Sequence, residues 1–270
     1  MAFSVLLSLY HKENPEFLRQ SLDSVFSQTL RPDEVILVED GPLTAELYAV
    51  LDEYEKNHTE LRRVKLPENG GLGKALNEGV KYCSYNLVAR MDTDDIAKHD
   101  RFERQIEIFD KYPDADIVSS WIEEFIDTPE NIVSTRKLPE FQYEIYRYGK
   151  TRCPVNHPAV MFKKDAVLFA GGYRHFPLFE DYYLWVRLLL NGAKFYNVQD
   201  SLLYFRTSKE MYRRRGGFGH ALNEIKFQNH IRKIGYTTYP QFLFNVAVRF
   251  VTRIVPNKLR SYIYRTFLRR

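Results

Sequence analysis

Three aspartates lie within four positions of the chain, directly after an apolar stretch. The stretch covers residues 85–89, and Asp92, Asp94 and Asp95 follow it. Carboxylates crowded this closely repel one another unless a cation lies among them, and oxygen ligands suit a hard divalent ion such as Mg²⁺ or Mn²⁺. The competing interpretation is an acidic turn after a strand, because Asp favours turns. The pattern therefore indicates a strand that ends at a candidate metal site.

A second apolar run, residues 34–41, also ends in acids, Glu39 and Asp40. Parallel strands bring such residues to one edge of a sheet, and ligands bind at that edge in open α/β folds. Asp40 is therefore a candidate acceptor for hydrogen bonds from a base or a ribose. A simple turn at Asp40-Gly41-Pro42 is the alternative.

A glycine-rich turn, residues 69–74, precedes a third amphipathic segment and ends in Lys74. It has neither the spacing of a P-loop nor that of a dinucleotide-binding loop. Lys74 at the start of a helix could still contact a diphosphate, because the free N–H groups there favour anions.

Two further acids, Glu180 and Asp181, precede the aromatic residues Tyr182, Tyr183 and Trp185. A carboxylate beside aromatic side chains is a candidate general base, and aromatic faces suit sugar rings. The alternative is a helix that begins at Asp181 and buries its aromatic residues in the core.

His157 and Arg214 are the remaining candidates. His157 precedes a short strand and could bind a metal, contact a phosphate or be hydrogen-bonded within the fold, the last being the default expectation. Arg214 lies in a cationic cluster, residues 213–215, that is followed by two glycines. This cluster could close over a diphosphate or a lipid phosphate, or it could be a solvated turn.

The elements that must position these residues alternate between strand and helix patterns over the first 120 residues. Strands are expected at 3–9, 34–41, 61–66 and 85–92, with helices from Pro15, around 47–54 and at 74–82. Repeated units of this kind predict a Rossmann-like, mostly parallel sheet with helices on both faces. Later in the chain, 160–162 is typical of a strand and 182–190 of a helix. We expect one α/β domain over residues 1–210 and a helical extension over 211–270.

Composition indicates a folded chain in a reducing compartment. The chain has 270 residues, 44% hydrophobic and 27% charged, which is enough for a large core. Its two cysteines, Cys83 and Cys153, indicate no disulfide framework and fit a reducing cytosol. The first residues lack the basic region of a signal peptide, and no uncharged stretch has the length of a membrane span.

The extension differs in charge from the rest of the chain. It contains thirteen Lys and Arg but a single acid, Glu224, which gives a net +12, whereas residues 1–210 carry −8. Residues 242–255 are apolar except for Asn245, Arg249 and Arg253, which recur every fourth residue and form one polar stripe. A second basic helix is expected after Pro256. Such helices favour a membrane interface, although packing on the domain is the alternative. No nucleic-acid motif accompanies the charge.

Five segments in order along the chain resemble the inverting family 2 glycosyltransferases, which have the GT-A fold. These segments are Ser4–Tyr10, Val25–Thr29, Val35–Gly41, Met91–Phe102 and Gly171–Leu188. The resemblance covers about residues 3–206. The extension, with its Arg214-Arg-Gly-Gly217 segment, is similar to that of bacterial enzymes that build capsule, O-antigen or exopolysaccharide units.

The resemblance implies metal-dependent transfer of a sugar from a UDP-sugar to a saccharide hydroxyl, with Mn²⁺ or Mg²⁺ as cofactor. It assigns the uracil and ribose to Ser8, Tyr10 and Asp40, the base or diphosphate to Lys74, the ribose or metal to Asp92, the metal to Asp94, general-base catalysis to Asp181, and the acceptor to Glu180 and Trp185. The expected acceptor is a saccharide, lipid-diphosphate-linked, at the inner face of the bacterial plasma membrane. The chain is accordingly expected to be cytoplasmic and peripheral to that membrane.

Two other functions remain open at this point. A sugar nucleotidyltransferase also uses an α/β sheet and a metal held by carboxylates, but the glycine-rich loop it needs after the first strand is missing from residues 10–14. A non-catalytic protein that docks on a membrane through its basic extension is the second alternative.

Overall fold

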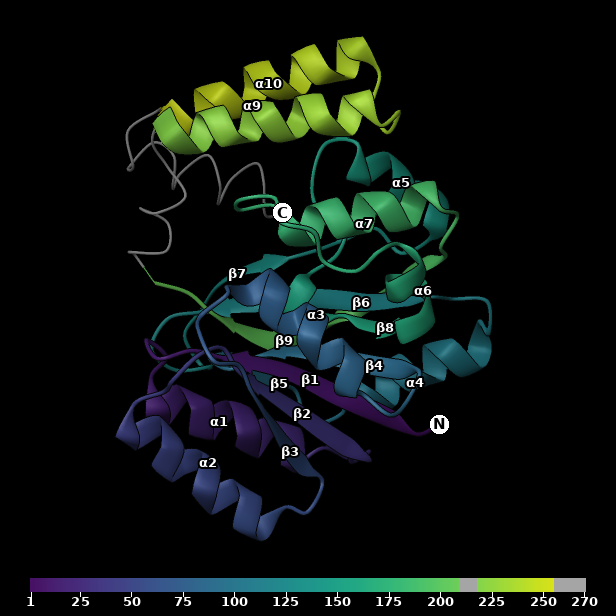
Figure 1. Ribbon diagram of the computed structural model, residues 1–270. Coiled ribbons are helices and arrows are strands. Elements are labelled where there is room, and N and C mark those ends of the chain that lie inside the picture. Colours follow the sequence, from purple (N-terminus) through teal and green to yellow (C-terminus); the bar gives the residue numbers. More distant parts are fainter. Residues whose placement is uncertain (209–217, 255–270) are drawn as a thin grey trace.

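The computed structural model describes residues 1–208 and 218–254, and its strands form one sheet (Figure 1). The strands are β1 (Phe3–Leu9), β2 (Glu34–Glu39), β3 (Leu61–Lys65), β4 (Leu87–Asp92), β5 (Ile96–Ala97), β6 (Ile117–Phe125), β7 (Ile132–Arg136), β8 (Met161–Lys163) and β9 (Phe195–Arg206). The order is β3-β2-β1-β4-β8-β6-β9-β5, with β7 beside β6. The four strands expected in the first half are all present.

Most of the sheet is parallel. Strands β1 to β4 pair in parallel, and β6 pairs in parallel with β9. The short β8 lies antiparallel between β4 and β6 and so joins the two parallel parts. The carboxyl ends of β1, β2 and β4 therefore lie at one edge, as the positions of the acids predicted.

The sheet is covered on both faces because its central strands are apolar on both sides. Leu7 of β1 packs into one core with α1, α2 and α4, whereas its neighbour Leu6 packs into a second core with α3 and α7. Alternation of side chains along a strand produces this division. The helices are α1 (Pro15–Phe26), α2 (Ala45–Asn57), α3 (Leu72–Tyr82), α4 (Arg101–Lys111), α5 (Gln142–Gly149), α6 (Lys164–Phe169), α7 (Glu180–Leu190), α9 (Phe218–Lys233) and α10 (Tyr239–Ile254), with a 3₁₀ turn, η1, at His157–Ala159.

Local sequence explains how these helices begin and end. Pro15 occupies the first turn of α1, and the Asn14 side chain accepts a hydrogen bond from the backbone N–H of Glu16. Helix α7 ends at Leu190 and is capped by Asn191, and Gly192 follows with a φ of 84°, the left-handed conformation that glycine adopts without strain. The predicted helix at 182–190 is confirmed, with Glu180 and Asp181 added to its first turn.

The extension packs on the domain through α9. The ring of Phe227 is stacked on that of Phe179 at 4.7 Å, and Phe227 is fully buried. Helix α10 lies along the outer side of α9 (Figure 1). Helices α9 and α10 therefore pack on the domain, which was the alternative expected for the first helix of the extension.

The predicted polar stripe of α10 faces inward. Asn245 donates to the backbone oxygen of Lys150 at 2.7 Å, and Arg249 forms an ion pair with the buried Glu224 at 2.5 Å. Arg214, the Arg253 side chain and the helix expected after Pro256 lie outside the described residues. None of the described helices is both long enough and apolar enough to cross a membrane.

Candidate active site

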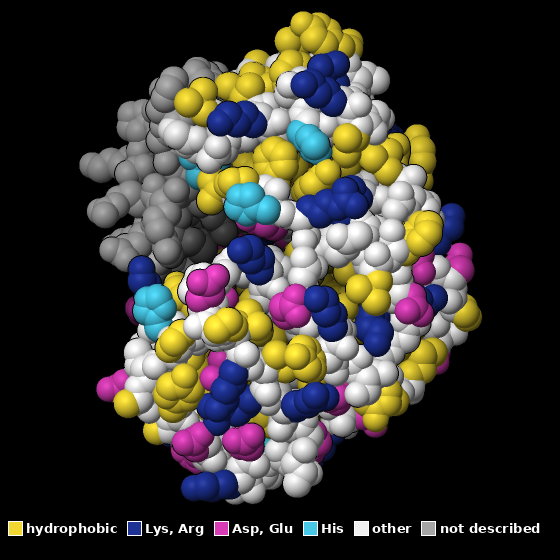
Figure 2. Space-filling model, viewed as in Figure 1, with side chains coloured by type: hydrophobic (Ala, Val, Ile, Leu, Met, Phe, Trp, Pro, Cys, Tyr) yellow, Lys and Arg dark blue, Asp and Glu magenta, His cyan; other side chains and the backbone are white. Residues whose placement is uncertain are grey.

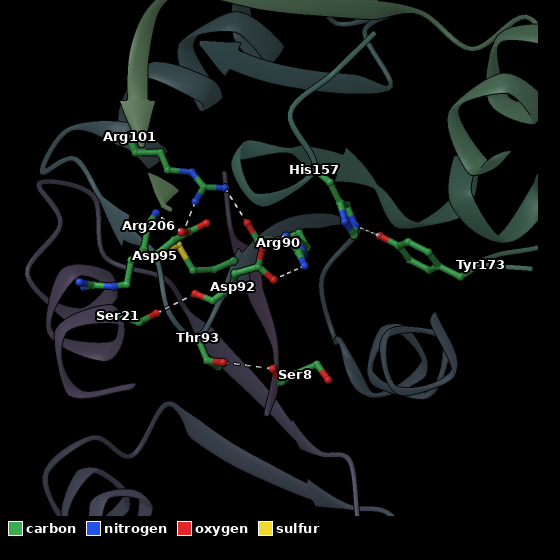
Figure 3. Close-up of polar contacts among 11 residues, drawn as sticks. Ser8, Ser21, Arg90, Asp92, Thr93, Asp95, Arg101, His157, Tyr173 and Arg206 are labelled. Atoms are coloured by element: carbon green, nitrogen blue, oxygen red, sulfur yellow. Dashed lines mark hydrogen bonds and ion pairs between the residues drawn. The ribbon is translucent and has the colours of Figure 1, made fainter. Parts of the chain in front are cut away.

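The acid cluster lies where β4 ends beside β1. Asp92 is level with Ser8 in the register of these two strands, and its backbone oxygen accepts a hydrogen bond from Ser21 of α1 at 2.9 Å. Thr93 donates to the backbone oxygen of Ser8 (Figure 3). These contacts fix the start of the loop that carries Asp94 and Asp95.

The three carboxylates are close enough to share one cation. Oxygens of Asp92, Asp94 and Asp95 lie within 4.8 Å of one another. Burial, together with the charge of Asp92, raises the pKa of Asp94 to about 6, and burial raises the pKa of Asp95 well above its ordinary value. Oxygen Oδ2 of Asp95 is buried without a hydrogen-bond partner. An oxygen-only set with this repulsion fits a hard divalent ion.

Arg206, the last residue of β9, binds the loop that carries Asp94 and Asp95. Its backbone N–H donates to Asp95 at 2.8 Å, and its Nε donates to the backbone oxygen of Asp94 at 2.8 Å. Because β9 also pairs with β5, which follows the acids, the loop is tied to the sheet on both sides.

A buried arginine supports the other end of the cluster. Arg90 of β4 is fully buried, and its guanidinium binds both carboxylate oxygens of Asp92, one of them at 2.7 Å (Figure 3). A second buried arginine, Arg101, donates to the backbone oxygen of Arg90 at 2.7 Å. Forked pairing of this kind fixes the orientation of a carboxylate. Asp92 is therefore held rigidly at the mouth of the site.

A pocket of about 310 Å³ connects Asp92 with the start of α7. It is lined by Arg90, Arg136, Tyr173, Glu180 and Asp181, among others. Asp181 is half-buried, and loss of contact with water raises the pKa of its carboxyl above the ordinary value. A carboxylate with a raised pKa in a pocket suits a general base.

The neighbours of Asp181 and Glu180 are also defined. The thiol of Cys153 lies 4.0 Å from Oδ2 of Asp181, and burial raises the pKa of that thiol to about 12, so it remains protonated. Glu180 packs against Gly73 at the start of α3, where an added Cβ would lie 3.4 Å from its side chain. The N-terminal ends of α3 and α7 therefore meet at the pocket.

His157 is hydrogen-bonded within the fold, which was the default expectation for it. Its Nε2 is hydrogen-bonded to the hydroxyl of Tyr173 at 2.8 Å (Figure 3). Burial, with a smaller effect of Arg90, lowers the pKa of His157 well below its ordinary value. The neutral ring lines the pocket and positions Tyr173, so it offers no positive charge to a phosphate.

The residues predicted to bind a nucleotide surround the ends of β1, β2 and α3. Ser8 and Tyr10 are half-buried, and Lys74 is exposed in the first turn of α3. Asp40 is buried, and its carboxylate accepts hydrogen bonds from the backbone N–H groups of Gly70 at 2.7 Å and Gly71 at 3.0 Å. A carboxylate has about four acceptor positions, so Asp40 can still accept from a ligand.

This second role of Asp40 gives a testable effect on stability. We expect Asp40→Ala to lower the free energy of unfolding by about 1–3 kcal/mol, because two partly buried N–H groups lose a charged acceptor. Urea denaturation would measure the change, with Asp114→Ala, at an exposed acid outside the site, as the control. Equal unfolding midpoints for Asp40→Ala and wild type would show that the loop at 70–71 does not depend on this carboxylate.

One predicted contact is wrong. Trp185 was expected to bind the acceptor, but its side chain is completely buried in the core beneath α7. Eight successive residues of α7, 182–189, are buried, so only its first turn, with Glu180 and Asp181, reaches the pocket. Tyr173 lines the pocket in its place.

Three arginines of the site were not singled out from the sequence: Arg90, Arg136 and Arg206. Arg90 could have been identified from the sequence, because it is a charged residue inside an otherwise apolar strand. Arg136 and Arg206 come from β7 and β9, whose positions beside the pocket depend on long-range pairing that local patterns do not reveal.

A family model and curated relatives match this chain. The model for glycosyl transferase family 2 matches residues 4–168. The UDP-Gal:alpha-D-GlcNAc-diphosphoundecaprenol beta-1,3-galactosyltransferase of Escherichia coli is 41% identical over 99% of this chain and 97% of its own length. The amylovoran biosynthesis glycosyltransferase AmsE of Erwinia amylovora is 37% identical over 97% of each chain.

Solved structures of glycosyltransferases share the fold. The mannosyltransferase PcManGT of Pyrobaculum calidifontis, in complex with GDP-Man and Mn²⁺, has a TM-score of 0.66 and 16% identity over 96% of this chain and 71% of its own. TarS of S. aureus, in complex with UDP-GlcNAc, has a TM-score of 0.64 and 16% identity over 99% of this chain and 72% of its own. The expected GT-A fold is confirmed.

Proposed function

This chain belongs to glycosyltransferase family 2, and on that premise we propose that it transfers a hexose from a UDP-sugar to a lipid-diphosphate-linked saccharide in cell-surface polysaccharide biosynthesis. UDP-galactose and a GlcNAc-diphospholipid are the first substrates to test, because a relative of nearly equal length is named for that pair. The site of action is then the inner face of the bacterial plasma membrane.

One observation carries the proposal: a single pocket joins Asp92 of the acid cluster to the half-buried Asp181. The acid cluster and Asp40 lie at the edge of the sheet where a nucleotide diphosphate binds in α/β folds. Asp181 lines the same pocket from the start of α7. A donor sugar between the acid cluster and Asp181 would have the Asp181 carboxylate on the side opposite its diphosphate.

The proposed reaction is a single displacement. Asp181 takes the proton of the acceptor hydroxyl as that oxygen bonds to C1 of the sugar, and the bond between C1 and the diphosphate oxygen breaks. Attack from the opposite face inverts the anomeric centre, so an α-linked donor gives a β-linked product. A divalent ion held by Asp94 and its neighbours would stabilise the charge on the departing diphosphate.

The other pocket residues position the reactants. Arg90 keeps Asp92 oriented toward the ribose or the metal, and Arg206 fixes the backbone of Asp94. The aromatic ring and hydroxyl of Tyr173 offer a surface for a sugar ring, in the role once expected of Trp185. Glu180, with its pKa raised by burial, shapes the acceptor side of the pocket.

Nucleotide-dependent thermal stability would test the donor class first. We expect UDP with Mn²⁺ to raise the melting temperature more than GDP, CMP or dTDP, because a ligand of the folded state stabilises it by mass action. Transfer from UDP-galactose, UDP-glucose and UDP-GlcNAc to a short-chain GlcNAc-diphospholipid would then be followed by mass spectrometry. Stabilisation by GDP alone, or transfer only to acceptors without a diphospholipid, would contradict the proposal.

A further inference from the structure

The outer face of α10 is apolar from Tyr239 to Val248. Tyr239, Leu243, Phe244 and Val248 have exposed fractions of 60%, 50%, 63% and 44%, and Ala247 between them is also exposed. Their spacing of four and five residues places them on one side of the helix. A surface helix ordinarily turns this side toward the core.

The side that faces the protein is the polar one. Arg249 pairs with Glu224 at 2.5 Å and also donates to the backbone oxygen of Thr151. Asn245 is 3% exposed and donates to the side chain of Gln228 at 2.9 Å. Because these polar contacts fix which side points inward, rotation of α10 cannot bury its apolar residues.

The adjacent surface of α9 is basic. Lys226 and Lys233 are exposed, and the guanidinium of Arg232 lies over the ring of Tyr239 at 5.8 Å. Glu224, the single acid in residues 218–254, is buried in its ion pair. Apolar and basic side chains therefore gather over the two helices at the top of the view (Figure 2).

We propose that this face of α9 and α10 docks the protein on an anionic lipid bilayer, a step that rests on the proposed lipid-linked acceptor. Aromatic and aliphatic side chains enter the interface, and the lysines contact lipid phosphates. The sequence after the described residues, 255–270, adds five basic residues and no acid. A second copy is a poorer partner for this face, because symmetric pairing would bring like charges together.

Docking here would hold the acceptor side of the pocket at the membrane. Phe179, which immediately precedes Glu180 and Asp181, is stacked on Phe227 of α9. The ring of Phe176 lies 5.2 Å from the same Phe227. Tyr182 of α7 also lies against the Phe227 ring, at 4.9 Å between centroids, so α9 and the helix that carries Asp181 are in direct contact.

Two matched double substitutions would test the apolar part of the face. We expect Leu243→Ser with Phe244→Ser to weaken binding to phosphatidylglycerol-rich vesicles by roughly tenfold or more, because the inserting side chains are lost. Leu168→Ser with Phe169→Ser in α6 is the control, since this adjacent Leu-Phe pair is exposed by 49% and 80%. Both variants should keep the wild-type melting temperature and its shift with UDP and Mn²⁺.

The basic part has its own test. Lys226→Glu with Lys233→Glu should reduce binding to the anionic vesicles and remove most of its salt dependence, because charge attraction to lipid is screened by salt. Lys56→Glu with Lys111→Glu, exposed lysines of α2 and α4, changes the net charge equally and should bind as wild type does.

Three results would overturn the docking surface: no vesicle binding by wild type, equal binding by the α10 variant, or equal losses in the α10 and α6 variants. A concentration-dependent dimer in light scattering that Leu243→Ser with Phe244→Ser abolishes, without vesicle binding, would assign the face to a second copy. Vesicle binding with no UDP effect and no transfer would instead reject the proposed function and leave the surface intact.

Discussion

Asp181→Asn is expected to slow sugar transfer by about 10²–10⁴-fold, the usual contribution of a general base. The amide keeps the shape of the carboxyl but cannot take the proton of the acceptor hydroxyl. Asp181 lines the pocket at the start of α7 and is not one of the clustered acids, so the affinity for UDP with Mn²⁺ should stay close to that of wild type. Single-turnover transfer and UDP titration would measure the two quantities separately. Wild-type turnover in the variant would remove Asp181 from the role of base.

The raised pKa of Asp181 adds a dependence on pH. Transfer by wild type should fall as the pH is lowered through this raised pKa, because the base becomes protonated. Stability runs the other way: the folded state holds the proton more tightly than the unfolded state, where the pKa is about 3.9. Wild type should therefore lose stability as pH rises from that value through the folded pKa. Asp181→Asn should be more stable than wild type at neutral pH. Below the pKa of Asp181 in the unfolded state, the two proteins should be equally stable.

Asp94→Ala is expected to remove most of the effect of Mn²⁺ on nucleotide binding and to weaken UDP binding by about tenfold or more, because Asp94 would hold the divalent ion that stabilises the diphosphate. Of the remaining carboxylates, Asp92 has both oxygens bound by Arg90, and Asp95 has one oxygen bound by the backbone N–H of Arg206. Calorimetric titration of UDP with and without Mn²⁺ would measure the loss. Asp114→Ala, at an exposed acid outside the site, is the control.

The same variant has a pH signature. With the pKa of Asp94 at about 6, protons should compete with the cation, so stabilisation of wild type by Mn²⁺ should decline as pH falls below that value. Asp94→Ala should show little stabilisation by Mn²⁺ at any pH. Metal-dependent UDP binding of normal strength in Asp94→Ala would reject Asp94 as a ligand.

The early part of the fold could be predicted because its signals are local. Each strand from β1 to β4 is a short apolar run, and each helix between them shows one apolar side, so the order of elements follows directly from the sequence. The edge that gathers the acids follows from the parallel pairing of β1, β2 and β4. The family match likewise decides for a glycosyltransferase over a nucleotidyltransferase or a non-catalytic protein.

Other features could not be predicted because they depend on what surrounds a residue. An aromatic residue beside two acids has the same local pattern whether it lines a pocket or fills the core, and the complete burial of Trp185 depends on the cover provided by η1 and β9. The stripe at Asn245 and Arg249 shows that α10 has two unlike sides. Which side faces inward is decided by Glu224 and Gln228, seventeen or more residues earlier.

The inward-facing polar side of α10 also bears on how mutations that truncate the chain should be interpreted. A stop codon before Tyr239 would delete Arg249 and Asn245, and removing one partner of a buried ion pair typically costs about 3–5 kcal/mol. Such an allele should abolish the protein itself through misfolding and degradation. Its phenotype would then match that of a complete deletion and would give no information about membrane targeting, which missense alleles on the outer face of α10 can reveal.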